Sequence, residues 1–130
     1  MIEFNGWAII RESFTEKGED EELLNDIICK IQMKISELDC VNEIYSLKCL
    51  NGTYHLGIMV NHNHQNDNVI EFFKWISEIS KGSYGVLYML DDECIEIENR
   101  NNFKVWIMKK GKIFEHKDTY LSPINLEIEE

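Results

Sequence analysis

The stretch from Asn66 to Asp92 constrains the fold most, because it joins a helical pattern to a fully apolar strand. Its first half repeats apolar residues at helical spacing, as one face of an α-helix does. These residues are Val69, Phe72, Phe73, Ile76 and Ile79. Asn66 or Asp67 can cap this helix, and Gly82 suits the left-handed residue that ends many helices. The run Val86–Leu90 lacks polar alternation, which favours a strand that is covered on both sides and central in its sheet.

The segment before this stretch predicts another strand and another helix. Residues 4–12 are apolar on both faces of an extended chain, with Trp7 on one face and Ala8 on the other, which indicates a second central strand. Residues Leu23–Leu38 carry an apolar stripe at helical spacing. Acidic residues precede this stripe, where the positive end of a helix dipole favours them.

An Asn-Gly pair marks the clearest hairpin. Asn51-Gly52 favours a two-residue type I′ turn between strands at residues 43–50 and 53–60, which pairs Leu50 with Thr53. This register places Cys49 on the face that points to the core.

The C-terminal part predicts a loop and a second hairpin. Residues 91–102 form an acidic loop that is compatible with a short strand at residues 95–97. Residues 103–108 and 113–116 then form a last hairpin around a lysine-rich turn. The tail after this hairpin is expected along the surface.

The order β-α-β-β-α-β with a C-terminal β-hairpin predicts an α+β fold. The first six elements match the ferredoxin-like arrangement, in which right-handed crossovers place both helices on one face of an antiparallel sheet. The 130 residues contain no linker and no internal repeat, so we expect a single domain over residues 1–130.

The charge balance limits the classes of partner. The chain has 13 basic and 24 acidic residues, a net charge of −11, which argues against nucleic acid and anionic membranes. A basic partner or plain solubility would explain this charge. No apolar run reaches the length of about 18 residues that suggests a membrane span. Neither a Cys-x-x-Cys pair nor a signal-peptide pattern occurs, so we expect the reducing cytoplasm.

Two histidines, His62 and His64, suggest a metal site, with His55 nearby. Alternate residues of a strand point the same way, and imidazole binds zinc and copper. However, no third ligand follows at a recognisable spacing, and the surrounding asparagines favour a turn. We expect a polar loop that caps the second helix or contacts a partner, without a metal or another cofactor.

No catalytic signature is visible. The four cysteines and four histidines form no nucleophile motif, and the seven glycines form no phosphate-binding pattern.

The acidic loop can be interpreted in three ways. Its carboxylates are Asp91, Asp92, Glu93, Glu96 and Glu98. Catalysis would need these groups in a cleft, and calcium binding would need a spacing that is missing here. The other interpretations are a solvated loop and an acidic patch for a basic protein. A second acidic group, which includes Glu19 and Asp20, precedes the first helix.

Trp106 is the tryptophan expected on a different face from its neighbours, because it alternates with Val105 and Ile107 on its strand. A position in the core or at its boundary is the simpler interpretation. Since aromatic anchors dominate many protein interfaces, we add Trp106 to the candidate partner-binding residues.

Sequence blocks along nearly the whole chain resemble a known family. They are FNGWAIIRES, LNGTYHL, NHNH, EFFKWISEISKGSYGVLYMLDD, FKVWIMKKGKI and DTYLSPINLEIEE. In order and spacing they resemble immunity protein family 7 of bacterial polymorphic toxin systems. The resemblance implies a non-enzymatic protein that binds and blocks a cognate toxin domain in its own cell's cytoplasm. It brings no established set of binding residues with it.

Two other functions stay open at this point. A ligand-binding regulatory domain on the same ferredoxin-like frame, which could dimerise through an open sheet face, would contain a deep apolar pocket with convergent polar groups. A small metal-dependent enzyme would retain zinc, copper or manganese on purification. The sequence does not distinguish a monomer from a homodimer.

Overall fold

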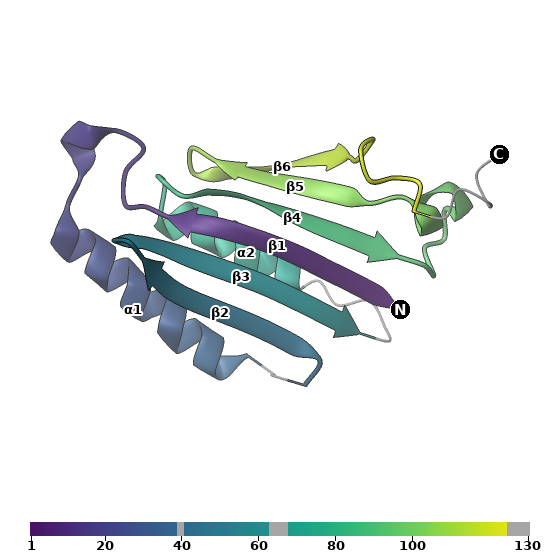
Figure 1. Cartoon of the computed structure of the whole chain (residues 1–130), viewed down its shortest axis with the longest axis horizontal. Coiled ribbons are helices and arrows are strands. Elements are labelled where there is room, and N and C mark those ends of the chain that lie inside the picture. The colour runs from purple at the N-terminus through teal and green to yellow at the C-terminus, as the bar shows by residue number, and fades with distance from the viewer. Residues whose placement is uncertain (39–40, 63–67, 125–130) are drawn as a thin grey trace.

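One antiparallel sheet carries two helices on one of its faces (Figure 1). The computed structural model describes residues 1–38, 41–62 and 68–124. Within this part the strands are β1 (Ile2–Ile10), β2 (Glu43–Leu50), β3 (Thr53–His62), β4 (Tyr84–Asp91), β5 (Lys104–Lys109) and β6 (Lys112–Lys117). The α-helices are α1 (Glu21–Glu37) and α2 (Asn68–Ile79), and the short 3₁₀ helices are η1 (Glu16–Gly18) and η2 (Ile97–Asn101).

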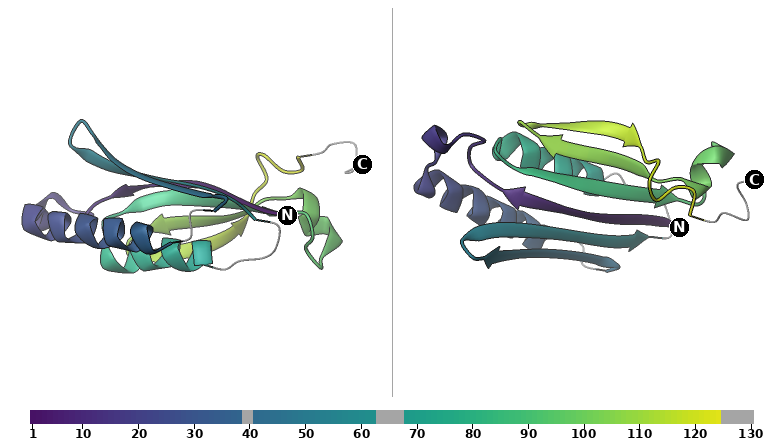
Figure 2. Two further views of the ribbon diagram at one scale, coloured as in Figure 1. Left: turned by 90° about the horizontal axis from the view of Figure 1, so that it is seen from below. Right: turned by 45° about the horizontal axis from the view of Figure 1, so that its top comes forward.

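The strand order in the described sheet is β2-β3-β1-β4-β5-β6. This order differs from that of a four-stranded ferredoxin-like sheet, because the C-terminal hairpin adds β5 and β6 beside β4. The structure therefore confirms the coarser prediction, an α+β fold with two helices and, in the described part, six antiparallel strands. The left view of Figure 2 shows both helices below the sheet.

The core lies between this sheet and the helices. Apolar residues at strand period two and at helical spacing meet there, since each pattern places them on one side of its element. They include Phe4, Ala8 and Ile10 of β1, Leu56 and Ile58 of β3, Ile27, Ile28 and Ile31 of α1, and Val69, Phe72, Phe73 and Ile76 of α2. Burial of a large apolar side chain of this kind contributes about 1.5–3 kcal/mol.

The opposite face of the sheet carries neither α-helix, and we call it the open face. The central position of β1 and β4 is confirmed, because each has a strand on both sides. The predicted coverage of residues 86–90 on both faces is wrong, because Val86 and Tyr88 lie half-buried on the open face.

The Asn-Gly hairpin forms as predicted, with φ of 51° at Asn51 and 80° at Gly52, and Leu50 pairs with Thr53. Cys49 pairs with Tyr54 on the side that faces the helices, as the register predicts, but it is exposed rather than buried in the core. The β2–β3 turn rises away from the helices in Figure 2, so the end of this edge strand lacks a helix to pack against.

Gly82 has a different role from the predicted one. Positive φ values among the described glycines occur at Gly52 and Gly111, so Gly82 is not left-handed. A Cβ at Gly82 would lie 2.3 Å from the carbonyl carbon of Ser13, and its N–H donates to the Arg11 carbonyl at 3.1 Å. A glycine is needed here because two backbone segments come very close.

Candidate functional site

The two acidic groups predicted from the sequence lie at opposite ends of the molecule (Figure 1). Asp91 pairs with Ile2 at the start of β1, whereas Glu19 and Asp20 lie beyond the end of that strand. The nine residues of β1 span about 30 Å at roughly 3.3 Å per residue. The two groups therefore cannot form one compact site.

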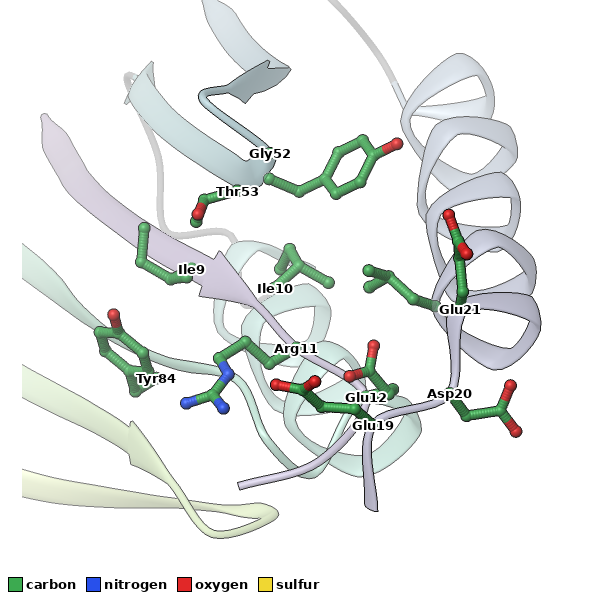
Figure 3. A pocket seen from close by; sticks show the side chains of 12 residues that line it. Ile9, Ile10, Arg11, Glu12, Glu19, Asp20, Glu21, Gly52, Thr53 and Tyr84 are labelled. Atoms are coloured by element: carbon green, nitrogen blue, oxygen red, sulfur yellow. The ribbon is translucent and has the colours of Figure 1, made fainter. Parts of the chain in front are cut away.

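The second acidic group surrounds a cleft of about 450 Å³, which we call the α1 cleft (Figure 3). Its walls come from the end of β1, the β2–β3 turn and the start of α1. The lining residues are Ile9, Ile10, Arg11, Glu12, Glu19, Asp20, Glu21, Leu24, Gly52, Thr53, Tyr54 and Tyr84. In Figure 3, Arg11 and Tyr84 lie on one side of the cleft and Glu21 on the other.

Local hydrogen bonds hold the cleft walls in place. The Asp20 side chain caps α1, because it accepts a hydrogen bond from the Leu23 N–H at 3.1 Å. The Arg11 N–H donates to Ser83 Oγ at 3.0 Å, which fixes the chain just after β1. The carboxylates of the cleft are therefore carried by restrained backbone.

The α1 cleft is strongly negative. It is lined by four carboxylates, those of Glu12, Glu19, Asp20 and Glu21, against the single guanidinium of Arg11. The ion pairs found among the described residues lie elsewhere, for example between Lys30 and Asp26 on α1. Such a cleft would attract a cationic side chain from a partner.

The acidic residues at the start of the acidic loop, Asp91 to Glu93, are partly neutralised by the Met1 amine. Asp92 Oδ1 accepts a hydrogen bond from the Met1 amine at 2.7 Å, and Glu93 Oε1 lies 3.6 Å from the same nitrogen. The hydrogen bond to Asp92 is the main cause that raises the pKa of this amine. Asp91 accepts a hydrogen bond from the Glu93 N–H at 3.0 Å. Less free negative charge is therefore available here than in the α1 cleft.

The rest of the acidic loop is helical rather than extended. The short strand considered at residues 95–97 is wrong, because Ile97 begins η2 and Ile95 is 95% exposed. Glu96 precedes η2 and accepts a hydrogen bond from the Asn99 side chain. Glu98 lies within η2, and its side chain is outside the described part.

Trp106 lies on the helix side of the sheet and is only 7% exposed. The predicted alternation with its neighbours on β5 is thus present, but it directs Trp106 into the core. The tryptophan that offers its surface to solvent is Trp7, which is 47% exposed.

The histidine segment is only partly described. His62 Nε2 lies 3.5 Å from Glu43 Oε2, and the Tyr45 hydroxyl donates to Glu43 Oε1 at 2.6 Å. His64 lies outside the described residues. Among the residues that are described, no three His, Cys, Asp or Glu side chains gather as a metal site would require.

Comparison with protein families gives a match over the whole chain. Residues 1–130 match the family model described as Immunity protein 7. The chain belongs to this family. Comparison with curated proteins and with solved structures gave no match. Family membership implies an immunity protein whose partner is a toxin protein, and it suggests a non-enzymatic, inhibitory role.

The open face of this immunity protein carries exposed apolar residues that the sequence interpretation did not select as a binding surface. Its exposed apolar residues are Trp7, Ile44, Leu50, Met59, Tyr84 and Phe114. Trp7 and Tyr84 pack edge to face with ring centroids 6.2 Å apart, and a hollow of about 250 Å³ lies beside Trp7 and Met59. The sequence held one signal for this face: residues 4–10 and 86–90 are apolar on both sides of their strands, and the two predicted helices lie on one side of the sheet.

None of the helices in the described ranges of this immunity protein is long and apolar enough to cross a membrane.

Proposed function

We propose that this immunity protein binds a cognate toxin domain of a polymorphic toxin system in the cytoplasm and blocks it by non-covalent occlusion. The observation that carries the proposal is the family match over residues 1–130. In this account the protein acts by stoichiometric binding and is not an enzyme.

The proposed toxin is a basic, nuclease-type domain. A nuclease attracts phosphate to its active site and therefore has a positive surface. The net charge of −11 supports such a partner, because complementary charge raises the rate of encounter.

The α1 cleft is the proposed first contact with the toxin, and Glu19 and Asp20 are among its carboxylates. Its shape supports this role, because a lysine or arginine side chain of a partner could enter the hollow. Asp91, Asp92 and Glu93, at the other end of β1, form a second proposed contact. Because the Met1 amine already binds two of these three, we expect them to contribute less.

The test compares two sets of charge-neutral variants for binding to the cognate toxin domain. The first set changes Glu12, Glu19 and Glu21 to Gln. The matched control changes Glu37, Glu71 and Glu78 to Gln. These three residues are exposed on the helices, outside the α1 cleft, and their change removes the same amount of charge. We expect the first set to slow association about tenfold at low salt, and the control set to change it much less.

Equal effects of the two sets would show that only the net charge matters and would remove the α1 cleft from the interface. Changing Asp91 and Asp92 to Asn and Glu93 to Gln tests the other end in the same assay. If this variant alone loses binding, the main contact lies beside the start of β1.

A ligand-binding regulatory domain was the alternative function. Such a site is mainly apolar and enclosed, with a few convergent polar groups. The α1 cleft is instead lined by several carboxylates at the surface. The geometry therefore favours a contact surface for a protein.

A further inference from the structure

The open face carries an apolar band that the α1 cleft does not explain. Strand pairing places Trp7 beside Val86, Val86 beside Ile107, and Ile107 beside Phe114, so one row of apolar side chains crosses four strands. Met59 lies in the next row and is 53% exposed. Exposed apolar patches of this kind mark binding surfaces.

Charged residues bound this band at its two ends, with opposite signs. Basic residues lie toward the C-terminal end of β1, and acidic residues lie toward its N-terminal end. The basic residues are Arg11, Lys48, Lys109 and Lys112, and the acidic residue on the open face itself is Glu3, with Asp92 and Glu93 just beyond the end of β4, where they contact the Met1 amine. The open face is therefore electrically polar along the strand direction, although the whole chain is acidic.

We propose that the open face binds a second copy of this chain, in a two-fold dimer whose facing β1 strands run in opposite directions. A two-fold axis brings the same surface of both copies together, so this surface must be complementary to itself. With opposed strands, the basic end of each copy lies over the acidic end of the other, and the apolar bands meet between them.

The twist of the sheet gives the same arrangement a matching shape. The β2–β3 turn and residues 118–124 after β6 rise on the open side (Figure 2) and lie at diagonally opposite corners (Figure 1). The other two corners of the twisted sheet are lower (Figure 2). The two-fold rotation that makes the facing β1 strands antiparallel places the raised corners of one copy over these lower corners of the other.

The size of the face suits a specific dimer. Six strands about 4.8 Å apart and a strand of nine residues at about 3.3 Å each give a face of roughly 25 by 30 Å. Specific interfaces bury about 800 Å² on each partner, which is close to this area.

The net charge does not prevent this pairing. Helix α1 lies on the opposite side of the sheet (Figure 2), so its acidic residues do not face the second copy directly, and those that line the α1 cleft with Arg11 and Tyr84 lie at the end of the sheet. Charges separated by more than about 8 Å of solvent are largely screened at physiological salt. The bases on the open face reduce the repulsion further.

The experiment measures the mass of the full chain by sedimentation equilibrium across a range of concentrations. We expect twice the chain mass of 15.4 kDa at high concentration. Met59→Gln should weaken the dimer about tenfold or more, as removal of a central apolar contact does. Met33→Gln is the matched control, because Met33 is 65% exposed on α1, and it should leave the dimer unchanged.

A charge exchange tests the orientation. We expect Lys48→Glu with Lys112→Glu to weaken self-association, and Glu3→Lys with Glu93→Lys to do the same. Mixing these two variants should restore a dimer, since each then supplies the charges that the other needs. Thermal unfolding of each variant checks that it is folded.

Three results would overturn the proposal. The first is a single-chain mass at every concentration, and the second is a dimer that Met59→Gln leaves intact. The third is a monomer whose toxin binding depends on Met59, because the toxin would then occupy the open face. The first two results leave the proposed function untouched, and loss of toxin binding by the α1 cleft variants would leave the dimer untouched.

Discussion

The two faces of the sheet use the same kinds of residue for different purposes. Phe4 and Trp7 lie three positions apart on β1, yet Phe4 is completely buried and Trp7 is 47% exposed. The helices cover the first face, whereas the second carries an apolar band, and the α1 cleft opens at the end of β1 between these two sides. An apolar pattern in a strand therefore identifies a face that can be buried. Which face is buried within the chain itself depends on the side of the sheet on which the helices pack.

The largest expected effect separates the two faces on a single strand. Phe4→Ala should lower the free energy of unfolding by about 3–5 kcal/mol, because it leaves a cavity in a packed core. Trp7→Ala, on the open face of the same strand, should lower it by about 1 kcal/mol or less. Urea unfolding of the two variants measures both values. Equal losses would mean that the open face is part of the stabilising core.

The next effect concerns the contact between the two central strands. A Cβ at Gly85 would lie 2.1 Å from the Trp7 carbonyl oxygen, so Gly85→Ala should cost about 1–3 kcal/mol. Gly57→Ala is its control, since that Cβ would meet only the Ser46 hydroxyl at 2.8 Å, and a side chain can rotate away. If thermal unfolding showed both variants equally stable, β1 and β4 would be less tightly joined than described.

A smaller effect is expected at the start of α1, where one residue both caps the helix and lines the cleft. Asp20→Ala should cost about 0.5–2 kcal/mol of stability through loss of the cap. Asp20→Asn should keep most of that stability, because asparagine also caps, while it removes a negative charge from the cleft. Association with the toxin should therefore slow for both variants. Restored binding in the Asn variant would show that the cap matters and the charge does not.

The smallest expected effect is a pH dependence of the stability that Asp118 contributes after β6. Burial disfavours the charged form of Asp118, but hydrogen bonds from the Tyr120 N–H, the Ser122 hydroxyl and the Leu121 N–H outweigh it, so the pKa of Asp118 lies below its ordinary value. This stabilisation is complete above the unfolded pKa of about 3.9 and disappears as the pH falls through the folded value.

Asp118→Asn should thus lose about 0.5–1 kcal/mol at neutral pH and little in strong acid, where the native Asp118 is also uncharged. Unfolding curves of both proteins at several pH values measure this difference. If the difference in free energy of unfolding between the two proteins stayed constant across the whole pH range, the stabilisation would not depend on the negative charge of Asp118.

Most of the fold followed from local patterns. The two helices, the type I′ turn at Asn51-Gly52 and the central position of residues 86–90 depend on short-range spacing, which the sequence shows directly. The errors at Cys49 and Gly82 have long-range causes. Cys49 lies at the end of an edge strand, where no helix packs against it. Gly82 must be a glycine because a side chain there would collide with the backbone of Ser13.

The candidate site was harder to predict because it depends on distances between segments. The acidic residues were identified individually, but the length of β1 keeps Asp91 far from Glu19. Trp106 was chosen for its alternation on β5, and the sequence could not say which of the two faces the helices would cover. For the same reason an open sheet face could be expected from the sequence, but the exposure of Trp7 on it could not.

The most direct test of the account is a titration of toxin activity with the purified immunity protein. If the protein neutralises its toxin by occlusion, activity should fall in proportion to the amount added and should reach zero when each toxin domain has one bound partner. Loss of activity at far smaller amounts would reveal catalysis, and full activity in the presence of excess protein would contradict the proposed inhibition.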